Sequence, residues 1–177
     1  MTRYSSIRPE TPADVVAIYA VNKQAFAGRQ AEPGLVDAIR TSAGFIPQLS
    51  LVAEQNGAIV GHILFSRTHI QTDNSLLPAL ALAPLAVLPE YQRQGIGSAP
   101  VRRGLQECRR LGQAVVIVLG CASYYPRFGF SAGLAKALEC PLETPNDPAA
   151  LQMRKFLRRY KRITSEAQAI FKLKRVR

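Results

Sequence analysis

The most constraining feature of this sequence is an apolar strand, a glycine-containing turn and a helix that follow one another between residues 79 and 111. Ala79–Leu88 is a continuous apolar run, which is typical of a strand buried on both faces. Gln92–Gly97 contains the turn, and from Ser98 the apolar residues recur at helical spacing up to about Leu111. The chain has 177 residues, a length that predicts one domain, or one domain with an appendage, around this succession.

Further helices and strands are predicted on both sides of this succession. A strand is expected at Arg3–Arg8, followed by a helix that begins at Thr11 and Pro12, because threonine caps helices and proline suits their first turn. Asn56-Gly57 favours a type I′ turn and so predicts a hairpin. The other predicted elements are a helix at Glu32–Ser42, hairpin strands at Leu49–Gln55 and Ala58–Ser66, a buried strand at Ala114–Leu119, a short helix at Ser123–Phe128 and one strand within Phe130–Leu142.

The composition excludes several classes of protein and of site. The longest apolar run, Leu76–Leu88, is interrupted by Pro78 and Pro84 and falls short of the about 20 residues of a membrane span. The first six residues lack the apolar core of a signal peptide, so a cytoplasmic protein without membrane association is expected. The cysteines are expected to be reduced thiols, and neither their spacing nor that of the histidines fits a metal site. These residues are Cys108, Cys121, Cys140, His62 and His69.

The turn between strand and helix is a potential anion site. Gly95 and Gly97 leave the backbone accessible, and the N-terminus of the following helix adds partial positive charge. A strand-to-helix turn without any ligand is the alternative at this point. Two other phosphate motifs are excluded, because a P-loop requires Lys-Ser/Thr after the second glycine, and the dinucleotide fingerprint requires a third Gly or Ala where this chain has Pro100.

Gln92-x-x-Gly95-x-Gly97 is similar to the acyl-CoA loop of the GNAT superfamily of N-acetyltransferases, whose pattern is Gln/Arg-x-x-Gly-x-Gly/Ala. Tyr125-Pro-Arg-Phe-Gly129-Phe130 resembles the Tyr-x-x-x-Gly-Phe of the same family. The predicted strands and helices also follow the family's order over about residues 3–142. In detail, the chain looks closest to the bacterial predicted-acetyltransferase branch.

The resemblance implies the fold and the co-substrate. The expected class is α/β (α+β), a mixed, mostly antiparallel central sheet flanked by helices, within a domain at residues 1–147. The expected co-substrate is acetyl-CoA, with no metal, and the acetyl group would pass to a primary amine of a small molecule or peptide. The pyrophosphate would lie on the amides of Gln94 to Ser98 beside Arg93, and the pantetheine on the central strand. The cofactor-binding residues so implied are Ala86, Val87, Gln92, Arg93, Gln94, Gly95, Ile96, Gly97 and Ser98.

The resemblance also implies that Tyr125 is the catalytic general acid. A tyrosine with a pKa of about 10 can protonate a leaving thiolate of comparable basicity. The structural alternative is a core aromatic residue, and the adjacent Tyr124 is the competing assignment. No carboxylate lies on the central strand. Glu90, Glu54 and His62 remain candidate bases, and deprotonation of the amine through water is the alternative. Either glutamate can also be a solvated charge at a strand end, and His62 can be a structurally bonded histidine.

The C-terminal segment, residues 148–177, departs from the family pattern. It carries most of the formal net charge of +11, since residues 151–177 contain ten Lys/Arg and one acid. Where the family finishes its sheet with a strand, Leu151–Tyr160 here predicts a basic helix with one apolar stripe. Three interpretations remain open: a docked helix with a solvated basic face, binding of nucleic acid or an acidic partner, or a terminus that is atypical for the family.

The main hypothesis is therefore an N-acetyltransferase that uses acetyl-CoA. Two alternatives belong to other classes: a module of the same fold that binds CoA without turnover, and a nucleic-acid-associated protein acting through the basic tail. Dimers are common in the family, so a homodimer is a further expectation from the resemblance.

Overall fold

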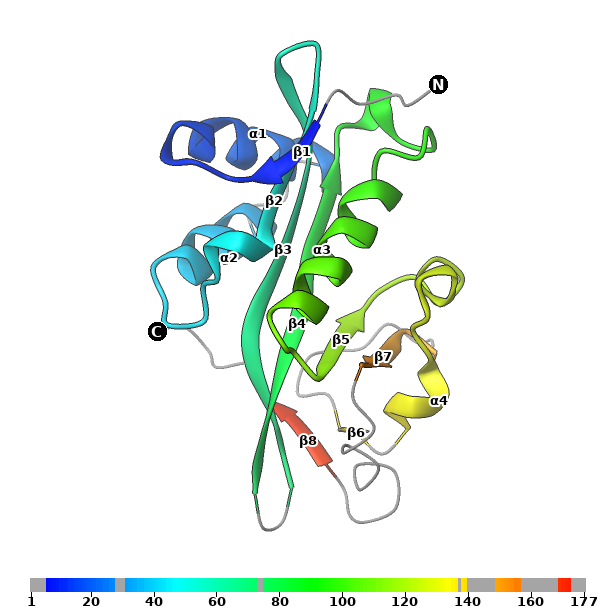
Figure 1. Cartoon of the computed structure of the whole chain (residues 1–177). Helices are drawn as coiled ribbons and strands as arrows, with labels where there is room; N and C mark the ends of the chain where they lie inside the picture. The colour runs from blue at the N-terminus through cyan, green and yellow to red at the C-terminus, as the bar shows by residue number, and fades with distance from the viewer. Residues whose placement is uncertain are drawn as a thin grey trace. The chain divides into compact units, whose positions relative to one another are not determined.

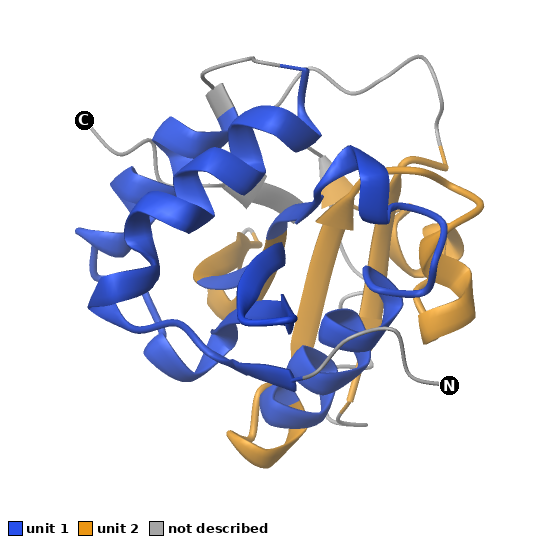
Figure 2. Cartoon of the chain, turned by 90° about the horizontal axis from the view of Figure 1, so that it is seen from above, with its two compact units in different colours: residues 1–66, 83–108, 176 blue, residues 67–82, 109–175, 177 orange. Residues whose placement is uncertain are grey.

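A computed structural model describes residues 6–27, 31–72, 75–136, 138–139, 149–156 and 169–172 of the chain (Figure 1). The chain divides into two compact units, shown in Figure 2. Unit 1 contains residues 1–66 and 83–108, and unit 2 contains residues 67–82 and 109–175. In the described ranges no helix has both the length and the apolar character that a membrane crossing requires.

Backbone ladders join six strands of the described chain in the order β1-β2-β3-β4-β5-β7. The β4–β5 pair is parallel, whereas β1–β2, β2–β3 and β5–β7 are antiparallel. A short strand, β8, pairs with β3 and with β6. The strands are β1 (Ser6–Pro9), β2 (Ser50–Gln55), β3 (Ala58–Gln71), β4 (Leu76–Val87), β5 (Val115–Leu119), β6 (Leu138–Glu139), β7 (Leu151–Lys155) and β8 (Ala169–Lys172). The predicted class, a mixed and mostly antiparallel sheet flanked by helices, is confirmed.

In unit 1, helices cover both faces of the sheet. The helices α1 (Val15–Ala25) and α2 (Ala31–Arg40) pack on one face, and α3 (Ser98–Arg110) packs on the other. The two faces alternate along β3, because Leu64 points to α1 and α2 while Phe65 lies against α3. The core under α1 and α2 is formed by Ile18, Val36, Ile39, Val52 and Leu64.

Two turns of unit 1 form as local chemistry predicts. Thr11 precedes a 3₁₀ turn, Pro12–Asp14, that leads into α1, and the carboxylate of Asp14 accepts a hydrogen bond from the Thr11 N–H at 2.7 Å. Asn56 and Gly57 both have positive φ, 51° and 78°, as a type I′ turn requires. The hairpin prediction is therefore confirmed, with Gln55 opposite Ala58.

Unit 2 has a core of its own around β5. The short helix α4 (Ala132–Ala135) precedes β6, and both lie on an apolar cluster shared with β4, β5 and β7. The cluster includes Ala79, Ala81, Val115, Ile117, Ala135, Leu138 and Met153. The one strand expected within Phe130–Leu142 is thus reduced to two residues behind a helical turn.

The helix predicted at Leu151–Tyr160 is wrong over the residues that the structure describes. Leu151–Lys155 is the strand β7, which pairs antiparallel with β5 so that Met153 lies opposite Ile117. The helical spacing of the apolar residues is overridden because the edge of β5, a fully apolar strand, needs hydrogen-bond partners along its whole length. The remaining part of the predicted helix, residues 157–160, lies outside the described residues.

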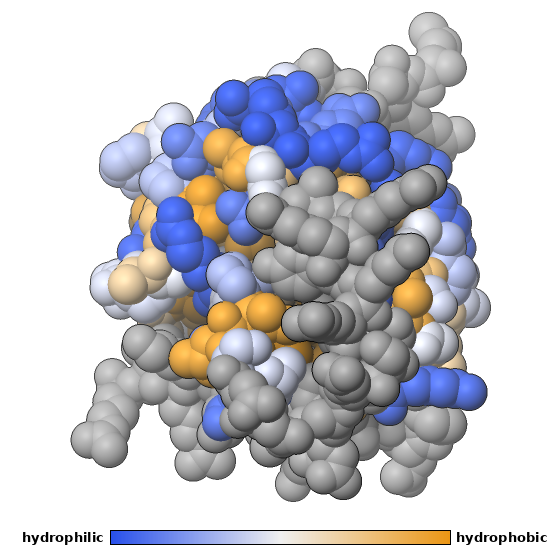
Figure 3. Space-filling view, turned by 60° about the horizontal axis from the view of Figure 1, so that its bottom comes forward, coloured by the Kyte–Doolittle hydropathy of each residue, from blue (hydrophilic) through white to orange (hydrophobic). Residues whose placement is uncertain are grey.

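Large hydrophobic side chains are exposed at few points of the described chain, namely Val16, Tyr19 and Leu76. The face seen in Figure 3 shows hydrophobic residues in separate patches between hydrophilic ones. Isolated exposed apolar residues of this kind are normal on a folded domain.

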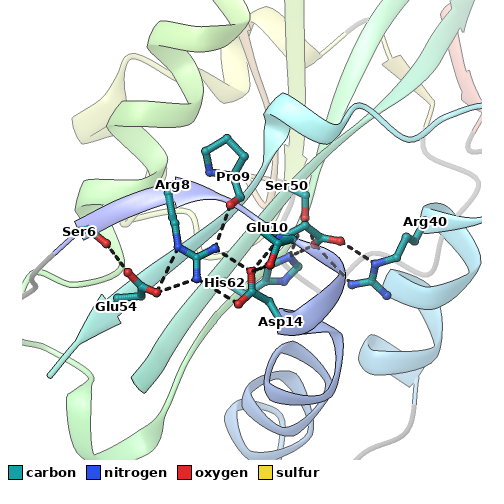
Figure 4. A network of polar contacts seen from close by, with 10 residues as sticks. Ser6, Arg8, Pro9, Glu10, Asp14, Arg40, Ser50, Glu54 and His62 are labelled. Atoms are coloured by element: carbon teal, nitrogen blue, oxygen red, sulfur yellow. Dashed lines mark hydrogen bonds and ion pairs between the residues drawn. The ribbon is translucent and has the colours of Figure 1, made fainter. Parts of the chain in front are cut away.

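A network of charged and polar side chains links β1, β2 and the start of α1 in unit 1 (Figure 4). The guanidinium of Arg8 donates to Asp14 at 2.7 Å and to Glu54 at 2.6 Å, and Ser6 also donates to Glu54. Hydrogen bonds from Arg8 hold the pKa of Asp14 well below its usual range, and together with Ser6 they lower the pKa of Glu54. Both acids are therefore ionised partners of one arginine.

The same network continues into the core at Glu10 and His62. Glu10 accepts hydrogen bonds from Arg40, at 2.7 Å, and from Ser50. Burial of Glu10 opposes its charged form, but the neighbouring His62 ring, Arg40 and Ser50 outweigh this and lower its pKa to about 2. The carboxylate is thus a buried anion that is compensated from three sides.

His62 is fully buried and both of its ring nitrogens are used. The side-chain amide of Asn22 donates to the Ile18 carbonyl at 2.9 Å and to Nδ1 of His62 at 3.1 Å. Nδ1 is therefore the acceptor, and the neutral ring carries its proton on Nε2, which lies 3.0 Å from the Ser50 hydroxyl. Burial also lowers the pKa of His62, so the ring is neutral and ties α1 to β2 and β3.

The contact between α3 and β3 predicts a large effect of one methyl group. A Cβ at Gly104 would lie 2.2 Å from Cε2 of Phe65, whose side chain is completely buried. Gly104→Ala is expected to lower the free energy of unfolding by about 1–3 kcal/mol, the usual cost of overpacking a filled core. Urea unfolding measures the change.

Gly34→Ala in α2 is the matched control, because a Cβ there has no neighbour within 4 Å. It should raise stability by up to about 1 kcal/mol, since alanine favours a helix over glycine. Equal effects of the two substitutions would contradict the packing described for α3.

The buried carboxylate predicts a loss of stability in acid. The pKa of Glu10 is about 2 in the folded chain against 4.5 for an ordinary glutamate, so the unfolded chain binds the proton first. The stabilisation, about 3 kcal/mol at neutral pH, is complete above the unfolded pKa and is lost as the pH falls toward the folded one. Urea unfolding across this pH range should show the fall.

Glu10→Gln should be less stable than the wild type at pH 7 and should lose less stability in acid. Asp14 and Glu54 remain to produce part of the fall. Glu90→Gln, at an exposed position outside the network, should keep the wild-type profile. An unaltered acid profile in Glu10→Gln would show that this carboxylate is not the group responsible.

Candidate active site

The strand β4 continues beyond its ladder with β5. That ladder pairs Leu80–Leu82 with Val116–Val118, whereas β4 itself extends to Val87. In the described residues, therefore, the last five positions of β4 form no part of this ladder. The backbone N–H and C=O groups on that edge of the strand are free of β5, as a ligand that adds to a strand edge requires.

The direction of each backbone group follows from the pairing with β3. The N–H of Leu88 donates to the carbonyl of Val60 at 2.9 Å, so Leu88 faces β3. Since residues alternate along a strand, Ala86 also faces β3, while Val87 and Leu85 face the other edge. Of the two strand residues predicted to hold the cofactor, only Val87 is on the open edge. Leu85 was missed, although the period of two could have indicated it.

The two glutamines of the loop bind the protein's own backbone. Nε2 of Gln92 donates to the carbonyl of Val87 at 3.0 Å, and the backbone N–H of Gln92 donates to the carbonyl of Pro89 at 3.2 Å. Nε2 of Gln94 donates to the carbonyl of Glu90 at 2.8 Å. These carboxamides hold the loop against the end of β4.

The loop between β4 and α3 is a sequence of tight turns. Arg93 and Gly95 have left-handed backbone conformations, with φ of 57° and 87°, and the N–H of Ser98 donates to the carbonyl of Gly95 at 3.1 Å. A Cβ at Gly95 would have no neighbour within 4 Å, so glycine is favoured there by its backbone angle. Ile96 is buried against the sheet and anchors the loop, and Gly97 leads into α3.

The helix α3 begins at Ser98, directly after the loop. Pro100 lies buried in its first turn without interrupting it, as expected where an N–H has no partner in the helix. The first turn contains no acidic residue, so nothing there offsets the positive end of the helix dipole. The loop and the helix start thus provide a place for an anion in unit 1.

Tyr125 begins a 3₁₀ helix, Tyr125–Phe128, in unit 2. Its side chain is buried, and its ring meets that of Phe130 edge to face at 5.7 Å. A Cβ at Gly120 would lie 2.6 Å from Cε2 of Tyr125, so the glycine at the end of β5 makes room for the ring. Gly129, with φ of 82°, closes the 3₁₀ helix.

Burial of Tyr125, with the nearby Tyr124 and Cys121, raises its pKa above the usual value near 10. The hydroxyl therefore stays protonated at neutral pH and can donate. In the part of the chain that the structure describes, no hydrogen bond of this hydroxyl to another residue is found. These properties suit a proton donor to a ligand.

Tyr124 differs from Tyr125 in exposure and in contacts. It is half-buried, its ring meets that of Tyr125 at 5.1 Å, and the guanidinium of Arg127 lies 4.7 Å from its ring centre. Such a cation–π contact stabilises a surface aromatic residue. Nearby, a hydrogen bond with Ser123 lowers the pKa of the exposed Cys121 thiol.

The candidate bases are held in the network described above or exposed. Glu54 is an ion-pair partner of Arg8, so its interpretation as a solvated strand-end charge is wrong. His62 is a structurally bonded histidine, and Glu90 is exposed beside the loop. Within the described ranges, no three His, Cys, Asp or Glu side chains are grouped as a metal site would require.

Comparisons with known proteins agree with this arrangement. The family model described as "Acetyltransferase (GNAT) domain" matches residues 6–133. The uncharacterized N-acetyltransferase YjhQ of Escherichia coli K12 is 38% identical over 142 residues, which cover 80% of this chain and 78% of the relative. YhbS, a second N-acetyltransferase of that organism, is 32% identical and covers 83% of this chain and 84% of its own length.

Solved structures show the same fold. YhbS of Escherichia coli in complex with CoA has a TM-score of 0.78 at 27% identity, covering 97% of this chain and 92% of that one. A GNAT family acetyltransferase from Brucella melitensis in complex with acetyl-CoA has a TM-score of 0.70 at 33% identity, covering 88% and 90%. The family model over residues 6–133 and the 38% identity to YjhQ agree with the fold and with the loop before α3. The chain therefore belongs to the GNAT family of N-acetyltransferases.

Proposed function

We propose that this N-acetyltransferase transfers the acetyl group of acetyl-CoA to a primary amine by direct attack, with Tyr125 as the general acid. The observation that carries the proposal is in unit 1, where the open edge of β4 is followed directly by the glycine loop and the start of α3. The acceptor is a small-molecule or peptide amine.

Binding of the co-substrate would use backbone groups at both places. The amides of Gln94 to Gly97 and the positive end of α3 would hold the pyrophosphate, with Arg93 as a charged neighbour. The N–H of Ser98, which the sequence also suggested for this role, instead donates to the carbonyl of Gly95. The backbone of Leu85 and the N–H of Val87 would pair with the amides of the pantetheine as a further strand would, since Gln92 already takes the carbonyl of Val87. The relatives from Escherichia coli and Brucella melitensis, solved with CoA and acetyl-CoA, support acetyl-CoA as the co-substrate.

Tyr125 would act when the tetrahedral intermediate collapses. The bond between the acetyl carbon and sulfur breaks, the electron pair stays on sulfur, and the tyrosine hydroxyl donates its proton to the thiolate. The proton that the attacking nitrogen loses as the amide forms would return to the tyrosinate through water, which restores the acid. The raised pKa keeps the donor protonated until that moment. Because a raised pKa also makes Tyr125 a weaker acid, we expect its hydrogen bond to the developing thiolate to supply part of the stabilisation of the transition state.

The amine must lose a proton before it attacks. Glu54 and His62, which are bonded within the network of unit 1, are poorly suited to accept it. We therefore propose that the proton leaves through water. This keeps the catalytic protein groups to Tyr125 and the backbone that positions the thioester.

Acetyl-CoA should stabilise the folded protein. A ligand at 100 times its Kd contributes about 2.7 kcal/mol, which for a chain of this size raises the Tm by about 5–10 °C. Gly97→Glu should abolish the rise, because it places a carboxylate where the pyrophosphate would bind. Differential scanning fluorimetry with millimolar acetyl-CoA measures both.

Gly34→Glu is the control for Gly97→Glu, since it introduces the same charge at an exposed position of α2 with open space around it. It should show the wild-type response. A wild-type Tm that acetyl-CoA does not change would refute the proposed co-substrate.

Tyr125→Phe keeps the buried ring and removes the proton donor. General acid catalysis contributes roughly 10²–10⁴-fold, so we expect kcat to fall by at least about tenfold while the KM for acetyl-CoA is nearly unchanged. Release of the CoA thiol with a panel of primary amines gives both constants. Tyr124→Phe is the control and should retain activity. A larger loss of kcat in Tyr124→Phe than in Tyr125→Phe would show that Tyr124 is the general acid. CoA binding without any thiol release by the wild type would favour a module that binds CoA without turnover.

A further inference from the structure

A pocket of about 420 Å³ lies beside the first two turns of α3 in unit 1. One wall is the loop residue Gly95, and another is the side chain of Ile7 on β1. The rest of the lining comes from one stripe of α3, at positions spaced by three and four residues. These residues are Ala99, Arg102, Arg103 and Gln106.

The polar groups of this pocket match an anion. Two guanidiniums and one carboxamide can all donate hydrogen bonds, and no acidic side chain is among the lining residues. Glu107 pairs with Arg103 at 3.0 Å, but Arg103 still has half of its side chain exposed. The positive end of the α3 dipole acts in the same direction. A group with two negative charges would therefore be recognised better than one with a single charge.

The position of the pocket indicates which anion it would take. It shares Gly95 with the loop that we propose for the pyrophosphate of acetyl-CoA. Coenzyme A carries a further phosphate, a phosphomonoester on the 3′ oxygen of its ribose, which is separated from the pyrophosphate by that sugar alone. A phosphomonoester carries a charge of about −1.5 to −2 at neutral pH, which two guanidiniums complement.

We propose that Arg102 and Arg103 bind the 3′-phosphate of coenzyme A and so select acetyl-CoA over acetyl-3′-dephospho-CoA. This inference rests on the proposed function, because it assigns a second phosphate subsite to the same co-substrate. Ile7 and Ala99 supply the apolar walls beside it. The two arginines are thus specificity residues for the donor, apart from the groups that act on the thioester.

The test compares the two thioesters on three proteins. Isothermal titration without acceptor gives the Kd of acetyl-CoA and of acetyl-3′-dephospho-CoA for the wild type, for Arg102→Gln/Arg103→Gln, and for Arg109→Gln/Arg110→Gln. The last variant removes the same charge from the final turn of α3 and serves as the matched control. We expect the wild type to bind acetyl-CoA at least about tenfold more tightly than the dephospho compound.

Arg102→Gln/Arg103→Gln should lose this preference by binding acetyl-CoA more weakly, with its Kd for the dephospho compound unchanged. The unchanged value also shows that the variant is folded. The control variant should keep the preference. Equal Kd values for both thioesters in the wild type would overturn the inference, as would an equal weakening of both in the variant.

Two further outcomes separate the possible causes of failure. If the wild type binds neither thioester, the proposed function itself is wrong. If inorganic phosphate raises the Tm of the wild type but not of Arg102→Gln/Arg103→Gln, while the two thioesters bind equally, then the pocket takes free phosphate and the assignment to coenzyme A is overturned.

Discussion

The requirement that backbone N–H and C=O groups find partners governs this structure, and β4 is where it has the largest consequence. From Leu80 to Leu82 the strand pairs with β5, and beyond that point its edge is left to another partner. Gln92 occupies the carbonyl of Val87, which fixes the loop to the strand end. The loop then feeds α3, so an open strand edge, a tight turn and a helix start follow one another within unit 1.

The polar network around Arg8, Glu10 and His62 has a structural role that limits the chemistry. Buried charges are tolerated here because each has a close partner of opposite charge or a hydrogen-bond donor. The same partners remove Glu54 and His62 from consideration as freely accessible bases. The proposed reaction accordingly relies on Tyr125, a buried hydroxyl with a raised pKa, and on water.

The features that depend only on residues close to one another in the sequence could be predicted from the sequence. Threonine, proline and aspartate mark the start of the first helix, Asn56-Gly57 makes the hairpin turn, and the glycine loop precedes α3. Each of these is decided within four or five residues by backbone angles or by a side chain bonding nearby backbone. The family pattern Gln-x-x-Gly-x-Gly also marked the region of the candidate site, although not which backbone groups it presents.

The features that depend on distant residues could not be predicted in this way. The spacing of apolar residues at 151–160 favours a helix, but residues 151–155 form β7 because β5 offers a long edge to pair with. The partners of His62 come from α1 and β2, and the need for glycine at position 104 is set by Phe65 on another element. The sequence alone thus determined the local turns, the helix starts and the family. The tertiary structure decided which strand edge stays open, which charges are neutralised and which glycines are required, because these depend on contacts between segments that are far apart in the chain.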